Sequence, residues 1–295
     1  MAEVAEDAIR AEAAGFESLW VMDHIFLEQR GARVSGHEPM TLLGYLSAIT
    51  TSACLGALVL CNAFRHAGQL AREAAALADA SSGRFVLALG CGSQPVEHAA
   101  FAFPYSDRVS RLEETLVVLR PALSGERVDF DGRYIQIRNA SIVTTVPTPP
   151  LWLAASGPRM MRLAARFCDG WIGDFYGPDT ARFRAELGSF QEALADVGRS
   201  PELVEIVVGL NVLVADDQDR ASVLDRASRL SPPSEVPLED RALIGDAERI
   251  ADKIQEYWAA GADHVVLVPS PWHFGRFRID AIKNAATVVK LAHSM

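Results

Sequence analysis

The chain of 295 residues lacks any apolar run close to the roughly 20 residues that a membrane helix needs. It also lacks an excess of positive charge, because 28 lysines and arginines stand against 38 aspartates and glutamates. The resulting net charge of −10 repels a phosphate backbone, so nucleic acid is not an expected partner. Residues 1–15 have neither a basic start nor an apolar signal core. We therefore expect a cytoplasmic protein that binds neither membranes nor nucleic acid.

Cysteine is scarce as well. The four cysteines form no CxxC pair, and no histidine joins them at metal-ligand spacing; they are Cys54, Cys61, Cys91 and Cys168. This pattern is typical of reduced, mostly buried thiols in a cytosolic protein, and no metal site is expected.

No linker, low-complexity tract or short repeat divides the chain. A hydrophobic fraction of 49% and a charged fraction of 22% are typical of a globular protein with a sizeable core. A single α/β barrel commonly takes about 250 residues, so we expect one domain over residues 1–295.

Short apolar runs rich in valine, isoleucine and leucine alternate with longer amphipathic segments. Because the short runs are apolar on both faces, they predict buried parallel strands joined by helices. The predicted strands are 18–24, 55–60, 84–90, 151–156, 171–175, 204–214 and 264–269. The predicted helices are 2–14, 41–51, 69–81, 108–123, 158–168, 180–197, 220–230, 247–260 and 279–292.

Two segments break this rhythm. Residues 127–137 contain Asp131-Gly132, a hairpin turn signal, and are predicted to be a small insertion outside the barrel. Residues 231–237 hold three prolines and are predicted to be a loop at the barrel rim.

The seven predicted strands are one fewer than a closed (β/α)₈ barrel contains. Because the chain opens on a helix that leads into strand 18–24, the missing element is expected to be a first strand ahead of Met1. Either the chain lacks it or another segment fills the gap, so we expect a gap at that edge, a substitute segment or low stability. A strand encoded by natural upstream codons would explain all three. An open doubly wound sheet would also tolerate seven strands. Its first strand-to-helix turn would usually be rich in glycine, whereas residues 23–26 contain none.

In such a barrel, chemistry gathers where the strands end. The first visible strand ends in Asp23 and His24, and a histidine there is suited to exchange a proton near neutral pH. The alternative is a structural histidine that caps a loop. The third strand ends in Gly90-Cys91-Gly92-Ser93, where glycines allow backbone to approach a flat ring or a phosphate.

The fourth predicted strand runs into a turn before a helix, and that turn is a second candidate binding segment. It reads Ala155-Ser156-Gly157-Pro158, and the N–H groups of a helix start bind anions, so we favour a phosphate site over an ordinary helix cap. Trp171, Trp272 and His273 either line a substrate pocket or pack in the core and at the rim.

Several strings, in order along nearly the whole chain, resemble the luciferase-like monooxygenase superfamily. One string leads from Ala13 to His24, and a second from Ser82 to Gly92. The others begin at Arg111, Leu163, Ile244 and Ala260.

The resemblance implies a TIM barrel of the (β/α)₈ type with an insertion, and FMN or the deazaflavin coenzyme F420 as cofactor. The Asp23–His24 pair resembles the deazaflavin-dependent branch, in which the histidine lies beside the hydride-carrying carbon. The same branch implies a cis peptide bond at Leu58-Val59 behind the ring, and a cofactor-phosphate site at 155–158. A homodimer and a small-molecule substrate are also expected.

One departure concerns the substrate. Deazaflavin-dependent sugar-phosphate dehydrogenases carry an acid directly after the Gly-x-Gly turn, where this chain has Ser93. We therefore expect a hydride transfer between coenzyme F420 and another small organic substrate, with His24 as the proton-exchanging group. The alternatives are an FMN-dependent monooxygenase that receives reduced flavin from a partner, and a non-catalytic cofactor-binding barrel.

Overall fold

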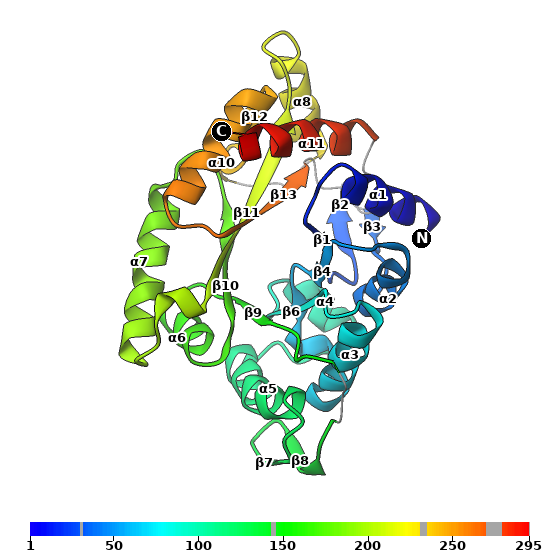
Figure 1. The fold of residues 1–295 in the computed structure, drawn as a ribbon, viewed down its shortest axis with the longest axis vertical. Coiled ribbons are helices and arrows are strands. Elements are labelled where there is room, and N and C mark those ends of the chain that lie inside the picture. Colours follow the sequence, from blue (N-terminus) through cyan, green and yellow to red (C-terminus); the bar gives the residue numbers. More distant parts are fainter. Residues whose placement is uncertain (30–31, 143–145, 231–234, 270–278, 295) are drawn as a thin grey trace.

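A computed structural model describes the whole chain except residues 30–31, 143–145, 231–234, 270–278 and 295. Parallel strands alternate with helices around a nearly closed barrel (Figure 1). The strands of this sheet are β1 (Ser18–Val21), β4 (Cys54–Ala57), β5 (Leu60–Cys61), β6 (Phe85–Gly90), β9 (Leu151–Ala154), β10 (Gly170–Tyr176), β11 (Glu205–Val214), β12 (Leu243–Gly245) and β13 (His264–Pro269).

The order of the sheet follows the chain. It runs β1-β4-β6-β9-β10-β11, with β5 paired to β6 and both β12 and β13 paired to β11. All seven predicted strands form, and each predicted span overlaps its strand. The predicted strand 55–60 is interrupted, however, because β4 ends at Ala57 and the chain resumes pairing only in β5.

The wall of the barrel has one break. Among the described residues, no backbone pairing joins β1 to β13. Side chains bridge the break instead: Ser18 Oγ lies 2.9 Å from His264 Nε2 and accepts a hydrogen bond from the Trp20 indole. Outside it, helices α1 (Ala2–Ala13) and α11 (Ile279–Ser294) contact each other.

The remaining long helices cover the barrel, as the amphipathic pattern predicts. Among the described residues, no helix is long and apolar enough to cross a membrane. Short helices α4 and α9 and strand β12 were not predicted. The helices are α2 (Pro39–Ile49), α3 (Ala67–Ala80), α4 (Pro95–Ala100), α5 (Arg108–Leu123), α6 (Pro158–Phe167), α7 (Ala181–Asp196), α8 (Arg220–Leu230), α9 (Leu238–Arg241) and α10 (Ala247–Ala259).

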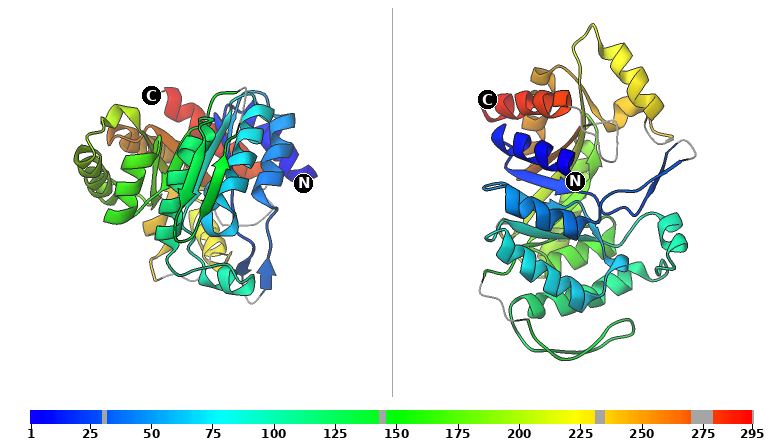
Figure 2. Two further views of the ribbon diagram at one scale, coloured as in Figure 1. Left: turned by 90° about the horizontal axis from the view of Figure 1, so that it is seen from below. Right: turned by 90° about the vertical axis from the view of Figure 1, so that its right-hand side faces the viewer.

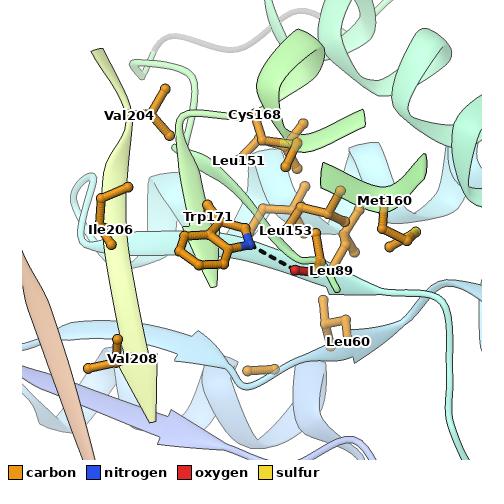
Figure 3. Packing of buried hydrophobic residues seen from close by; sticks show 14 of the residues in the cluster. Leu60, Leu89, Leu151, Leu153, Met160, Cys168, Trp171, Val204, Ile206 and Val208 are labelled. Atoms are coloured by element: carbon orange, nitrogen blue, oxygen red, sulfur yellow. Dashed lines mark hydrogen bonds between the residues drawn. The ribbon is translucent and has the colours of Figure 1, made fainter. Parts of the chain in front are cut away.

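Strands are apolar on both faces because each face meets a different core. Inside the barrel, Trp20 stacks on Trp152 at 5.3 Å beside a small cluster that includes Val86 and Val266. Between strands and helices, Trp171 is fully buried, stacks on Phe190 at 4.9 Å, and donates its indole N–H to the Ala155 carbonyl at 2.8 Å (Figure 3). Trp171 is therefore a core residue and does not line a substrate pocket.

Two hairpins lie outside the barrel sheet (Figure 2). Strands β7 (Val128–Asp131) and β8 (Gln136–Ala140) pair antiparallel where the sequence predicted an insertion. Glu114 anchors the turn by accepting hydrogen bonds from the N–H groups of residues 133–135. A second hairpin, β2 (Leu27–Gln29) with β3 (Ala32–Val34), was not predicted.

Candidate active site

The candidate residues follow neighbouring strands on one rim of the barrel. Because β1, β4, β6 and β9 pair in parallel, their C-terminal ends meet at the same edge. Asp23 and His24 follow β1, the 58–59 segment joins β4 to β5, residues 90–93 end β6, and residues 155–158 follow β9. The structure therefore brings the predicted segments to a common rim.

His24 is held by an acidic residue that the sequence did not single out. Its side chain is 23% exposed, and its Nδ1 lies 2.9 Å from Oε2 of Glu97 on α4. The other oxygen of Glu97 accepts hydrogen bonds from the N–H groups of Ile25 at 2.6 Å and Phe26 at 3.2 Å. One buried carboxylate thus holds the whole segment that leaves β1.

Asp23 is buried beneath His24. Its carboxylate accepts a hydrogen bond from the Cys61 N–H at 2.8 Å and pairs with the guanidinium of Arg65. Arg65 also contacts Glu38 at 2.7 Å, and these two carboxylates raise its pKa against the opposing effect of burial. Asp23 therefore fixes the end of β1 to the bend that follows β5, and a direct contact of Asp23 with cofactor stays a prediction.

The predicted cis peptide bond is present between Leu58 and Val59. It lies against the glycine-rich turn: a Cβ on Gly90 would stand 2.7 Å from a methyl group of Val59. Gly92 has a φ of +82°, and a Cβ there would meet Cys61 Sγ at 2.8 Å. These two positions exclude a side chain because Val59, Cys61 and His98 already fill the space beside them, so the turn packs closely on its neighbours.

Cys91 and Ser93 complete the turn. Cys91 is half-buried and Ser93 is exposed. Burial raises the pKa of the neighbouring Cys61 thiol to about 12, so Cys61 stays a neutral thiol.

The predicted phosphate segment leads from β9 into α6. Ala155 is buried and donates its N–H to the Ile172 carbonyl at 3.1 Å, while Ser156, Gly157 and Pro158 are exposed. Gly157 has a φ of +76°, and α6 begins at Pro158 without a side-chain cap from any described residue. The start of α6 is therefore exposed and has no side-chain cap from a described residue, which are two conditions that an anion site requires.

Two candidate functional residues, Glu97 and Asn62, could not be predicted from the pattern of strand ends. Glu97 lies on α4, which begins at Pro95. A proline is common at the start of a helix, and Pro95 was the one feature of the sequence that could have indicated this helix. Asn62, after β5, is 5% exposed and its Oδ1 has no hydrogen-bond partner among the described residues. Trp272 and His273 lie outside the described residues.

Comparison with known proteins identifies the family of the chain. The model of the family described as luciferase-like monooxygenase matches residues 1–231. The chain belongs to this family. The match contains the predicted proton-exchanging and cofactor-binding residues, from Asp23 to Pro158.

Relatives of known activity cover most of the chain. An F420-dependent hydroxymycolic acid dehydrogenase from Mycobacterium tuberculosis is 32% identical over 86% of this chain and 70% of its own. An F420-dependent glucose-6-phosphate dehydrogenase from Nakamurella multipartita is 31% identical over 85% of this chain and 75% of its own.

A solved structure shares the fold. An F420-dependent secondary alcohol dehydrogenase, in complex with an F420-acetone adduct, superposes with a TM-score of 0.81 at 23% identity, over 98% of this chain and 94% of that one. The luciferase-like TIM barrel that the sequence resemblance implied is thereby confirmed.

Proposed function

We propose that this luciferase-like barrel is an oxidoreductase that uses coenzyme F420 and moves a hydride between it and a small organic substrate. The observation that carries the proposal is the rim on which His24, held by Glu97, shares an edge with the cis peptide bond at 58–59 and the bare backbone of Gly90. The F420-dependent relatives support the choice of cofactor.

The residues present fit such a cofactor. Gly90 and Gly92 let the turn pack directly on Val59 and Cys61, so the 58–59 segment is held at the rim, where a flat ring would lie against Leu58 and Val59. The start of α6, with Ser156 and Gly157, would hold a phosphate through backbone N–H groups. When bound, the deazaflavin supplies the hydride-transfer chemistry, and the protein supplies orientation and a proton-exchanging group.

His24 is that proton-exchanging group in this proposal. Asp23 positions the strand end, and residues 90–93 and 155–158 bind the cofactor. Because Ser93 stands where sugar-phosphate dehydrogenases of this branch carry an acid, the substrate is a compound other than a sugar phosphate.

The runner-up activity is an FMN-dependent monooxygenase, and the third is a barrel that binds cofactor without catalysis. Titration with F420 and with FMN, together with a turnover assay, separates the three. Tight binding of F420 with weak binding of FMN is the expected result, and the reverse result supports the monooxygenase. Binding without turnover supports the non-catalytic barrel, and binding of neither cofactor supports a defective barrel.

Replacing His24 with alanine tests its role once turnover is measured with an alcohol panel. Loss of a general acid or base lowers turnover by roughly 100-fold or more, while F420 affinity should change little. The melting temperature should fall, because Oε2 of the buried Glu97 loses its partner. Unchanged turnover in His24→Ala would assign proton exchange to another group.

We also propose that the barrel is one strand short, and that an eighth strand fits between β1 and β13. A cavity of about 360 Å³ lies there, lined by both strands and by α1 and α11. Its lining includes apolar residues from each element, among them Ala8, Leu19, Val266 and Val289.

A further inference from the structure

Glu97 is placed to do more than stabilise a loop. It is 2% exposed, and a carboxylate is rarely buried to this degree unless it is paired or fully hydrogen-bonded. No lysine or arginine in the described part of the chain pairs with it, so its bonds are the one to His24 and the two to backbone N–H groups.

Its two oxygens have separate partners. Oε1 alone accepts the N–H groups of Ile25 and Phe26, which is sufficient to anchor the segment after β1. Oε2 contacts the imidazole of His24 at 2.9 Å. A purely structural anchor would not need a second oxygen directed at the ring of the one histidine at this strand end.

We infer that Glu97 positions His24 for proton exchange, by holding the proton of the neutral ring on Nδ1 so that Nε2 is the atom that takes or gives a proton. This inference rests on the proposed function for its catalytic meaning. A carboxylate only accepts hydrogen bonds, so it selects the tautomer with Nδ1–H, the orienting arrangement that recurs wherever a histidine acts beside a carboxylate.

The arrangement favours a substrate whose reacting carbon bears a hydroxyl group. When such an alcohol is oxidised, a bound deazaflavin would accept the hydride of the C–H bond, and Nε2 of His24 would take the O–H proton. The alcohol would become a carbonyl compound and His24 an imidazolium, beside which the carboxylate of Glu97 lies as a partner of opposite charge. In the reverse direction the imidazolium returns the proton to the carbonyl oxygen.

The decisive variant is Glu97→Gln. Its carbonyl oxygen can still accept the N–H groups of Ile25 and Phe26, but its amide nitrogen then faces Nδ1 and donates, which favours the opposite tautomer of His24. The matched control is Glu12→Gln, because Glu12 also accepts backbone N–H groups, those of residues 51–53, far from this rim.

The measurement is nitrogen NMR of the full chain labelled at its seven histidines, with the His24 signals assigned by their loss in His24→Gln. We expect Nδ1–H in the wild type, Nε2–H in Glu97→Gln, and no change in Glu12→Gln. With F420 and secondary alcohols, kcat of Glu97→Gln should fall about 10- to 100-fold while the Kd for F420 changes little.

The outcomes separate the two proposals. An Nε2–H tautomer in wild-type His24 overturns the positioning role, and this result needs no variant to fold. If folded Glu97→Gln keeps the wild-type tautomer of His24, the positioning role of Glu97 is also overturned. If the tautomer switches as expected but the wild type binds no F420, the positioning role stands and the proposed cofactor is wrong.

Discussion

Among single residues, Glu12 shows how one carboxylate can hold two elements together. Desolvation acts to raise the pKa of Glu12, but hydrogen bonds from the N–H groups of Ala53, Ser52 and Thr51 outweigh it and lower the pKa to about 2. The carboxylate thereby ties α1 to the loop before β4. A group whose folded pKa is depressed stabilises the fold above its unfolded value of 4.5, and this contribution disappears as the pH falls towards 2.

Glu12→Gln should therefore lower the melting temperature at pH 7, and the gap to the wild type should narrow between pH 4.5 and pH 2. Thermal unfolding followed by circular dichroism across this range measures the gap. Glu6→Gln is the control, because among the described residues Glu6 pairs with the exposed Arg10 alone, and this variant should show almost no gap. A gap of constant size from pH 7 to pH 3 would contradict the assigned role of Glu12.

Gly157 offers a test of the phosphate segment with a built-in control. Gly157 and Gly198 both have positive φ, of +76° and +68°, and a Cβ at either would meet no atom within 4 Å. Valine strains the backbone at both positions, and more so at Gly157, whose ψ of 159° lies in a region that is essentially restricted to glycine. The melting temperature of both variants is therefore measured beside their F420 affinity. Only Gly157→Val should weaken F420 binding, by roughly 10-fold in a fluorescence titration, because its side chain would cover the start of α6. Equal F420 affinity in the two variants would move the phosphate site elsewhere.

The sequence predicted His24 but not Glu97, and the reason is physical. His24 ends a strand, and parallel strands gather their ends at one rim, so position alone marked it. Glu97 lies 73 positions further on in a helix of six residues, which is too short to show an amphipathic period. Its contact with His24 exists only because β1 and β6 end on the same rim.

At the scale of elements, the ends of a helix or strand were predictable where its periodic or apolar pattern ended abruptly in the sequence. Helix α5 and strand β13 begin and end where the sequence predicted, at Arg108–Leu123 and His264–Pro269. The break between β4 and β5 was not visible in the apolar pattern, since residues 55–60 form one continuous apolar run in the sequence. The resemblance, not the periodicity, located it.

The unpredicted elements share a different property. Strands β2, β3 and β12 have three residues each, so no alternation of apolar and polar residues can develop in them. Strand β12 exists because β11 is ten residues long: its first part pairs with β13, and its last three residues pair with β12. Such an extension is a product of sheet geometry and not of local sequence.

Cysteine burial also depended on the final packing. All four cysteines are free, as expected, and Cys61 and Cys168 are buried. Cys54 is exposed because it starts β4 at the outer edge of the barrel, so the expectation of mostly buried thiols holds for two of the four positions, with Cys91 between the extremes.

At the scale of the whole molecule, the break between β1 and β13 is the feature most open to test. Both strands run parallel to their one described neighbour, so a parallel strand between them would continue the direction of the sheet. Helix α1 lies outside the break and leads into β1, which is the position of a crossover helix between that strand and β1. A strand fused ahead of Met1 would therefore reach the break with the right-handed connection that parallel strands prefer.

The test is a designed extension of six residues that alternates valine and alanine, the length of β13, joined to Met1 by a short turn. Pairing with two edges and filling the apolar cavity should raise the melting temperature by roughly 5 °C or more, at about 2–4 °C for each kcal/mol in large domains. Amide hydrogen exchange in β1 and β13 should slow at the same time, because their facing N–H groups would gain partners. An extension of equal length made of glycine and serine should produce neither effect. If the two extensions behave alike, an added strand does not pair in this break, and the proposal that the barrel is one strand short must be abandoned.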